Sequence, residues 1–453
     1  MRLIHYSDIE NAHDAPETIG RLAGTIDALD GEGALVCGTG DNLAPGVLPL
    51  VSRGGIALEF FEAVRPAVET FGNHDFDFGP DRAAELVARS PQRWLSANVS
   101  RAGEPFAGVD PWCIERAGGE RVGFFGLTDP TTPSVGDFEH ELAFSDPIDA
   151  ARRAVEALRD RGVDYVVALS HLGRTDSRLA AACDIDVVLG GHVHTERIER
   201  IEGTVLTRPG TGGEVVLEVD LDAAEVNRHA VADGPLDSVL AGRYRERLAA
   251  AGLDTVVDTV EEPILRTDQE AFHGESRVGN FVADAYRWAA ERAVGTDPPV
   301  IGLQNSGGIR TGPPLTGAVT TGDLIGLVPF DEPLVVVELT GSALRSVLRS
   351  GGDTPGFGEP DWWHAHVSGA RLAYDYDEDR LTATTVAGDP IDPDRRYRLA
   401  VSEFLLHTDV EFPTLAESSV VERLDTQYRV LIEYARTVGI DPMVEGRIVR
   451  DGL

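Results

Sequence analysis

The first half of the chain repeats one pattern, in which a short apolar run rich in β-branched residues ends in a turn that carries Gly, Asp, Asn or His. LIHYSDIE opens the chain in this way, and the pattern returns in GALVCGTGDN, AVETFGNHD, RVGFFGLTD, DYVVALSHLG and IDVVLGGHVH. Helical patterns lie between these runs, such as DPIDAARRAVEALRDRG, which has Asp near its start and Gly at its end. Strands that alternate with helices predict a layered α/β domain whose polar residues gather at the carboxyl ends of the strands, where such folds bind ligands.

The pattern changes between residues 226 and 261. PLDSVLAGRYRERLAAAG is typical of a single amphipathic helix, and EEPILRTDQEAF begins a new run. We therefore predict a first domain over residues 1–225, a linker helix and hinge over 226–261, and a second, α+β domain over 262–453. GTVLTRPGTGGEVVLEVDLD predicts a hairpin that closes the first domain.

The charge of the chain excludes several classes of partner. Its 40 basic residues, all of them arginine, stand against 76 acidic ones, for a net charge of −36. Nucleic acids and anionic membranes would repel such a surface. An acidic, lysine-free composition favours a halophilic, haloarchaeal source, and the self-repulsion predicts a monomer or weak oligomer.

Two further features predict a cytoplasmic protein. The three cysteines, Cys37, Cys113 and Cys183, are widely spaced and form no disulfide framework. The chain begins inside a predicted strand, without the pattern of a signal peptide, and it has no apolar stretch long enough to span a membrane.

The polar residues at the strand ends form a set typical of a metal centre. Carboxylates, an amide and imidazoles suit two divalent cations such as Mn, Fe, Co or Zn, although each residue alone is more often a cap or a core residue. In GGHVH the two histidines, two residues apart on an extended segment, are expected to point the same way. The set comprises Asp8, Glu10, Asp41, Asn73, His74, His171, His192 and His194.

The order D…GD…GNHD…H…GHVH resembles the calcineurin-like metallophosphoesterases. With GNHDFDFG, and with ESRVGNFVADA, QNSGGIR and TTGDLIGLVPFDEPLVVVELTGSAL in the second half, the whole chain resembles the 5′-nucleotidase / 2′,3′-cyclic phosphodiesterase / UDP-sugar hydrolase family. The resemblance implies a four-layer β-sandwich flanked by helices and a C-terminal substrate-binding domain. It also implies a phosphoric ester hydrolase with two divalent metal ions, which cleaves nucleoside 5′-monophosphates or related nucleotides by attack of metal-bound hydroxide on phosphorus.

The resemblance also implies a role for each matching residue. Asp41 would bridge the metals, and His74, oriented by Asp77, would stabilise the phosphoryl oxygens or protonate the leaving group. One metal would be held by Asp8 and His194, the other by Asn73, His171 and His192. Arg277, Asn305 and Arg310 would contact the phosphate and ribose side of the substrate.

The chain departs from the family in two places. Glu10 stands where the family has a histidine ligand, and three interpretations remain open: Glu10 is itself a ligand, His13 replaces it, or one metal is weakly held. A glutamate ligand would favour Mn or Mg over Zn; Mn is the metal we expect first, with Zn, Co or Mg as alternatives. The second departure is a missing GGDG segment, which leaves Phe412 and either Trp363 or His364 at the positions of two base-stacking rings; packing residues would look the same.

Two other functions remain as alternatives. One is a sulfur-ester hydrolase of the same two-domain plan, and the other is a nucleotide-binding protein without catalysis. Nucleotide binding without phosphate release would favour the second.

Overall fold

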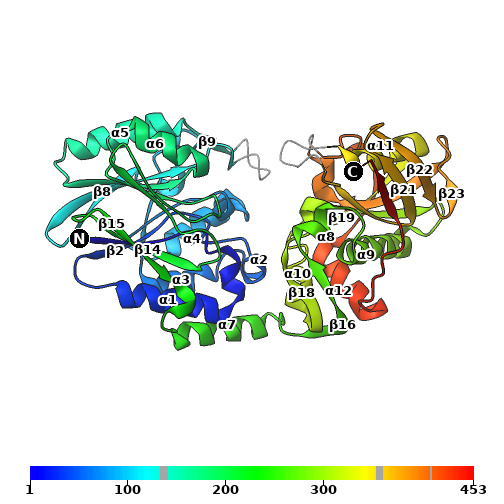
Figure 1. Cartoon of the computed structure of the whole chain (residues 1–453), viewed down its shortest axis with the longest axis horizontal. Coiled ribbons are helices and arrows are strands. Elements are labelled where there is room, and N and C mark those ends of the chain that lie inside the picture. Colours follow the sequence, from blue (N-terminus) through cyan, green and yellow to red (C-terminus); the bar gives the residue numbers. More distant parts are fainter. Residues whose placement is uncertain (133–140, 354–360, 409–410, 453) are drawn as a thin grey trace. The chain divides into compact units, whose positions relative to one another are not determined.

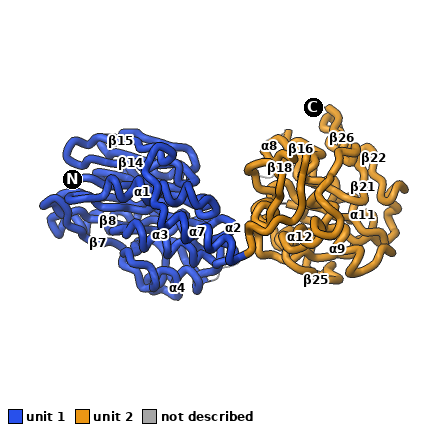
Figure 2. Tube along the Cα trace, turned by 90° about the horizontal axis from the view of Figure 1, so that it is seen from below, with its two compact units in different colours: residues 1–251 blue, residues 252–453 orange. Residues whose placement is uncertain are grey.

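The computed structural model describes residues 1–132, 141–353, 361–408 and 411–452. The chain divides into two compact units, Met1–Ala251 and Gly252–Leu453, which Figure 2 shows in different colours. The helix expected in a linker, α7 (Ser238–Ala250), lies within unit 1. The boundary between the units therefore follows this helix.

Unit 1 contains two six-stranded sheets. The first sheet runs in the order β15 (Glu225–Ala230), β14 (Val215–Asp220), β1 (Arg2–Tyr6), β2 (Ala34–Gly38), β3 (Val68–Thr70) and β4 (Arg93–Leu95). The second sheet runs in the order β12 (Arg197–Ile201), β13 (Thr204–Arg208), β11 (Val187–Gly190), β10 (Tyr165–His171), β8 (Glu120–Thr128) and β7 (Trp112–Ala117). A small sheet joins β6 (Glu104–Pro105), β5 (Val99–Arg101) and β9 (Leu142–Phe144).

The two large sheets pack face to face and helices cover their outer faces. Leu3 and Val68 of the first sheet share one buried cluster with Phe124 and Leu169 of the second. Helices α5 and α6 cover the second sheet, whereas α1, α3 and α7 lie on the side of the first (Figure 1). These layers confirm the predicted α/β four-layer sandwich. The helices are α1 (Pro16–Leu29), α2 (Val47–Ser52), α3 (Ala57–Val64), α4 (Pro80–Arg89), α5 (Pro147–Arg159), α6 (Asp176–Ala182) and α7.

The central strands of both sheets are parallel, which decides where their polar residues meet. β1, β2, β3 and β4 run parallel in the first sheet, as do β8, β10, β11 and β13 in the second. Parallel strands bring their carboxyl ends to one edge. The residues at or just after the carboxyl ends of β1, β2, β3, β10 and β11 therefore share one edge of unit 1.

The hairpin predicted from GTVLTRPGTGGEVVLEVDLD is wrong. β13 pairs with β11 and β12, whereas β14 pairs with β1 and β15 in the other sheet. Nearly every residue of the two strands is buried, so each fills an interior position of its own sheet instead of leaving one face to water. The loop between them crosses from sheet to sheet, and Gly212 N donates to Asp8 O at 2.9 Å.

Unit 2 combines three sheets with five helices in its described residues, in agreement with the predicted α+β class. A core cluster that includes Ile301, Val335 and Leu399 fills its interior. The five-stranded sheet runs β20 (Ala365–Ser368), β17 (Val300–Asn305), β24 (Arg396–Ser402), β19 (Pro333–Thr340) and β25 (Val420–Thr426). The others contain β23 (Asp389–Pro390), β22 (Arg380–Val386), β21 (Ala370–Asp375) and β26 (Ile448–Asp451), and β16 (Val256–Arg266) with β18 (Gly312–Thr320). The helices are α8 (Asp268–Phe272), α9 (Arg277–Val294), α10 (Thr321–Ile325), α11 (Gly341–Arg349) and α12 (Gln427–Val438). Among the described residues, no helix has both the length and the hydropathy needed to cross a bilayer.

Candidate active site

Four of the candidate metal ligands have left-handed backbone conformations. Asp8 and Glu10 follow β1 with φ of 48° and 42°, Asp41 follows β2 with φ of 54°, and His192 follows β11 with φ of 74°. Residues with a side chain avoid this region, at a cost of about 1–3 kcal/mol each, unless their surroundings fix them. Such strain is frequent at functional sites, and four of the thirteen described non-glycine residues with positive φ are predicted ligands.

The carboxylate of Asp75 fixes the loop that carries Asp41. It accepts hydrogen bonds from the backbone N–H groups of Asp41 at 3.0 Å and Gly72 at 2.7 Å, and also from Asn42 and Leu43. Gly72 has to lack a side chain, because a Cβ there would lie 2.1 Å from Asp41 Oδ1. The GNHD segment thus places Asp41 as well as contributing Asn73 and His74.

One group of ligand atoms is formed by Asp41, His171 and His192, whose ligand atoms lie within 4.8 Å of one another. His171 Nδ1 donates to Thr39 O at 2.7 Å, which leaves Nε2 directed towards Asp41 Oδ2 at 3.0 Å. Asn73 joins this group, because its Oδ1 lies 2.8 Å from His192 Nδ1.

A second group, within the same distance limit, is formed by Asp8, Glu10 and His194. Glu10 Oε1 lies 3.0 Å from His194 Nε2, and Asp8 Oδ1 accepts from His192 N at 3.0 Å. The expectation that His192 and His194 point the same way on an extended segment is wrong. β11 ends at Gly190 and the chain then bends, so the two imidazoles join different groups.

The atoms in these groups suit a cation. Within the described part of the chain, Glu10 Oε1 and His171 Nε2 are buried without a hydrogen-bond partner, although each lies 3.0 Å from an atom of its group. Burial raises the pKa of Asp8 to about 7. Burial disfavours charge on His171, yet the carboxylates of Asp41 and Asp8 raise the pKa of that imidazole to about 10. The buried carboxylates of Asp8 and Asp41 thus create a negative potential that favours a positive charge between the groups.

His13 does not lie among these ligands. Its Nδ1 is 2.9 Å from the Tyr244 hydroxyl and its Nε2 is 2.9 Å from Asn42 O, so both ring nitrogens are engaged. Of the residues considered for the position of the missing histidine, the structure brings Glu10 to His194 and holds His13 elsewhere.

The predicted acid and its orienting carboxylate lie together beside the first group. His74 Nδ1 is 3.0 Å from Asp77 Oδ2, and the backbone N–H of His74 donates to Asp41 Oδ1 at 2.7 Å. Although burial opposes it, Asp41 and Asp77 raise the pKa of His74 to about 10. This contact leaves Nε2 as the nitrogen of His74 that can face a substrate.

The three predicted substrate-binding residues of unit 2 differ from one another in what they contact. The Arg277 guanidinium donates to the backbone carbonyls of Pro442 at 2.9 Å and Glu262 at 3.1 Å, and also to that of Pro263, which are structural contacts. Asn305 is the last residue of β17 and donates to both carboxylate oxygens of Glu411 at 3.3 Å.

Arg310 lies over the ring of Phe330, with its guanidinium carbon 5.0 Å from the ring centroid. Phe330 is half-buried and was not among the predicted site residues. It lies in VPFDEP, just before β19, within a segment that carries the family resemblance, and that motif is the signal that could have found it.

Trp363 and Phe412, the predicted stacking rings, lie in the core cluster of unit 2. They are 0% and 1% exposed, and His364, the other residue considered, is 1% exposed. The Trp363 indole N–H donates to Ala365 O. In this conformation none of these rings offers an open face to a base, and both roles stay predictions that would require this segment to rearrange.

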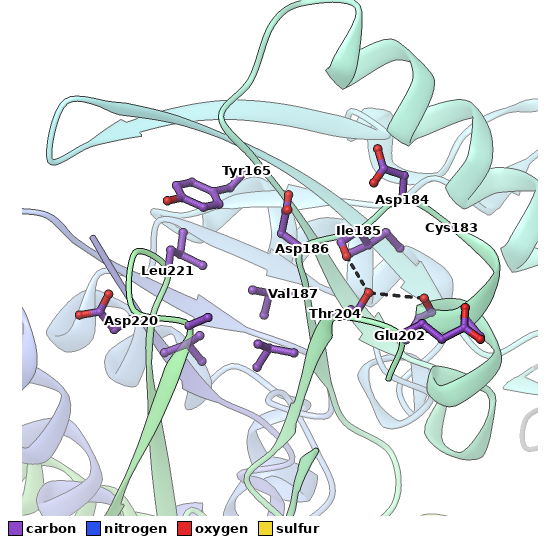
Figure 3. A pocket seen from close by; sticks show the side chains of 16 residues that line it. Tyr165, Cys183, Asp184, Ile185, Asp186, Val187, Glu202, Thr204, Asp220 and Leu221 are labelled. Carbon is purple, nitrogen blue, oxygen red and sulfur yellow. Dashed lines mark hydrogen bonds between the residues drawn. The ribbon is translucent and has the colours of Figure 1, made fainter. Parts of the chain in front are cut away.

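A hollow of about 330 Å³ lies at the opposite ends of the strands of unit 1 (Figure 3). Tyr165, Val187 and Thr204, near the starts of β10, β11 and β13, are part of its lining. Two of its polar groups are engaged: the Thr204 hydroxyl donates to Ile185 O at 2.7 Å, and Asp186 pairs with Arg159 at 3.0 Å. It carries none of the predicted site residues.

Comparisons with known proteins match both units. The sequence model of the calcineurin-like phosphoesterases matches residues 1–196, and that of the 5′-nucleotidase C-terminal domain matches residues 256–417. The chain belongs to this two-domain 5′-nucleotidase family. The two matches confirm the resemblance drawn from the motifs. The chain spans only 30%, 31% and 57% of the length of the first three curated relatives that it matches.

Individual relatives agree with the family. A trifunctional nucleotide phosphoesterase protein of Bacillus subtilis, YfkN, is 25% identical over 84% of this chain, which spans only 30% of that protein. A 5′-nucleotidase precursor of Thermus thermophilus superposes with a TM-score of 0.79 at 25% identity, covering 100% of this chain and 99% of that one. The sulfate thiohydrolase SoxB of Thermus thermophilus shares the fold, with a TM-score of 0.71 at 21% identity over 100% of this chain and 97% of that one.

Proposed function

We propose that the chain is a two-metal phosphoesterase that releases phosphate from nucleoside 5′-monophosphates or related nucleotides. The observation that carries this proposal is the pair of ligand groups at one edge of unit 1, with His74 and Asp77 beside them. Membership in the 5′-nucleotidase family and the matching C-terminal domain support a nucleotide substrate.

Two divalent cations would be held by the residues of these groups. Asp41, Asn73, His171 and His192 would hold one, and Asp8, Glu10 and His194 the other, with Asp41 shared. When bound, such ions supply Lewis-acid stabilisation of phosphoryl oxygens and lower the pKa of a water. Because Glu10 adds an oxygen donor and a negative charge, the second position favours Mn or Mg more than Zn.

His74 would act directly on the phosphoester. Asp77 accepts from Nδ1 and fixes the plane of the ring, so Nε2 would donate a hydrogen bond to a phosphoryl oxygen or a proton to the leaving oxygen. Asp77 thus acts as a positioning residue for His74. In unit 2, Arg310 and Asn305 are the proposed contacts for the nucleotide, with the exposed side of Phe330 as a further candidate.

The test compares Glu10→Gln with the wild type in concentrated KCl. Bound Mn is counted by mass spectrometry after dialysis, and phosphate release is assayed on a panel of 5′-mononucleotides, cyclic nucleotides and nucleotide sugars. Glu218→Gln is the matched control, because Glu218 on β14 is also a buried glutamate of unit 1 but pairs with Arg2 and His229.

We expect two bound metals and turnover of a 5′-mononucleotide in the wild type and in the control. Glu10→Gln should lose one metal and most of the activity. Nucleotide binding without phosphate release, whichever divalent metal is supplied, would refute the proposal in favour of a nucleotide-binding protein without catalysis. Two metals retained in Glu10→Gln would refute the assignment of Glu10 as a ligand.

A further inference from the structure

Helix α7 is connected to the edge of unit 1 that carries the candidate metal ligands, called the metal edge below, through the buried rings of Tyr244 and His13. Tyr244 of α7 and His13 are both 0% exposed, and their rings stack with centroids 5.8 Å apart and planes 8° apart. The Tyr244 hydroxyl lies 2.9 Å from His13 Nδ1 and 3.2 Å from Ile56 O. Neither residue belongs to the ligand groups.

The proton positions on His13 give this contact a direction. Its Nε2 lies 2.9 Å from Asn42 O, and a carbonyl oxygen can only accept, so Nε2 carries the proton. In a neutral ring Nδ1 can only accept, and it lies 2.9 Å from the Tyr244 hydroxyl, nearer than Ile56 O, the other acceptor of that hydroxyl, at 3.2 Å. We therefore direct the single hydroxyl proton to Nδ1. A continuous pair of hydrogen bonds therefore runs from α7 to the backbone of Asn42.

Asn42 joins the two loops that carry the candidate ligands. Its Oδ1 accepts from Ile9 N at 3.3 Å, and Ile9 lies between Asp8 and Glu10. Its Nδ2 donates to Glu69 at 3.0 Å, and the residue follows Asp41 directly. A displacement of Asn42 would thus reach three ligands that have left-handed backbone conformations.

Helix α7 is itself fixed against α1. Gly24 of α1 packs so closely that a Cβ there would lie 2.2 Å from Pro235 O, in the segment that leads into α7. Asp237 then caps α7 by accepting from Val239 N and Leu240 N. The helix is a rigid support, and it is the last element of unit 1 before the boundary at Gly252.

We propose that Tyr244 and His13 are positioning residues that hold Asn42, and through it the backbone of Asp8, Glu10 and Asp41, in the geometry that binds metal. The proposal rests on the proposed function, since it requires a cation at these residues. It makes the helix that precedes unit 2 part of the support of the metal centre.

The decisive variant is Tyr244→Phe, which keeps the stacked ring and removes only the hydroxyl. The full-length protein is titrated with Mn²⁺ alone in concentrated KCl by calorimetry, and the visible absorption of its Co²⁺ form is recorded. Tyr286→Phe is the matched control, because Tyr286 is also fully buried and its hydroxyl donates to Gln427 at 2.6 Å in unit 2. Thermal unfolding is recorded for both variants.

We expect Tyr244→Phe to weaken Mn²⁺ binding about fivefold or more and to change the Co²⁺ spectrum, as loss of a buried hydrogen bond behind a ligand does. The control should lose comparable stability and bind Mn²⁺ as the wild type does. His13→Gln, which keeps one donor for Asn42 O, should bind Mn²⁺ more weakly as well.

Two results would contradict the inference in distinguishable ways. If the wild type binds Mn²⁺ and Tyr244→Phe binds it equally well with an unchanged Co²⁺ spectrum, Tyr244 and His13 do not position the ligands. If the wild type itself binds no divalent cation, the proposed function fails and this inference fails with it.

Discussion

His366 should make unit 2 sensitive to acid, and the size of the effect follows from its burial. The ring is fully buried on β20, its Nε2 lies 2.9 Å from Ala271 O, and burial lowers the pKa of His366 from 6.5 to about 4. Below pH 6.5 the ring takes up a proton in the unfolded chain but stays neutral in the folded chain. The contribution of His366 to the free energy of unfolding is therefore fully present above pH 6.5 and is lost as the pH drops towards 4. At 1.36 kcal/mol per pKa unit, this ring lowers the free energy of unfolding by about 2 kcal/mol between pH 7 and pH 5, and by about 3 kcal/mol once the folded protein is also protonated.

His366→Gln isolates this effect, because Gln cannot titrate and its amide can still donate to Ala271 O. Unfolding by urea is measured at several pH values between 7 and 4, with hydrogen exchange of peptides from α9 as a readout specific to unit 2. Other buried histidines titrate equally in both proteins, so the difference between the two pH profiles belongs to His366. The reasoning is refuted if the variant and the wild type lose the same free energy of unfolding between pH 7 and pH 5.

Three further outcomes are expected. Gly24→Ala should lower the free energy of unfolding of unit 1 by about 1–3 kcal/mol through the clash with Pro235 O, whereas Gly242→Ala, which has open space around it, should be neutral or stabilising in urea titrations. Asp77→Asn should lower kcat at least about tenfold with two metals still bound, because His74 loses its orienting carboxylate. Steady-state kinetics with metal analysis would show a lost metal beside the lower kcat if Asp77 were a ligand, and an unchanged kcat would contradict the role of Asp77. With a net charge of −36, the protein should gain stability as KCl rises from dilute to molar concentrations, and a flat urea midpoint across that series would argue against a halophilic protein.

That the candidate metal ligands gather at one edge of unit 1 could be predicted from the sequence, because it follows from topology. Strands separated by helices become parallel neighbours, and parallel strands end at one edge. Asp8, Asp41 and Asn73 therefore come together at one edge of the first sheet. His171 ends β10 of the second sheet and joins them because the two sheets pack with these ends at the same edge. The predicted hairpin was wrong because topology was not visible there. A run that is buried on both faces does not show which of the two sheets it enters.

The surroundings of the aromatic and arginine side chains in unit 2 could not be predicted in this way. A sequence motif shows that Arg277 stands in ESRVGN, but not that the carbonyls of Glu262 and Pro442 lie close enough to take up its donors. Trp363 and Phe412 are equally plausible as base-stacking rings or as core residues from their sequence alone. The packing of β20 and its neighbours decides for burial.

The choice between Glu10 and His13 depends on backbone conformation, which short sequence patterns reveal poorly for residues other than glycine. Glu10 reaches His194 because its own φ is 42°, and it holds that φ because Asn42 fixes Ile9 next to it. His13 in turn is withdrawn from the metal edge by the bonds that hold Asn42 in place. The two residues are therefore not interchangeable candidates for one ligand position. The histidine supports the loop whose strained conformation presents the glutamate, so a change at either should alter the same metal position.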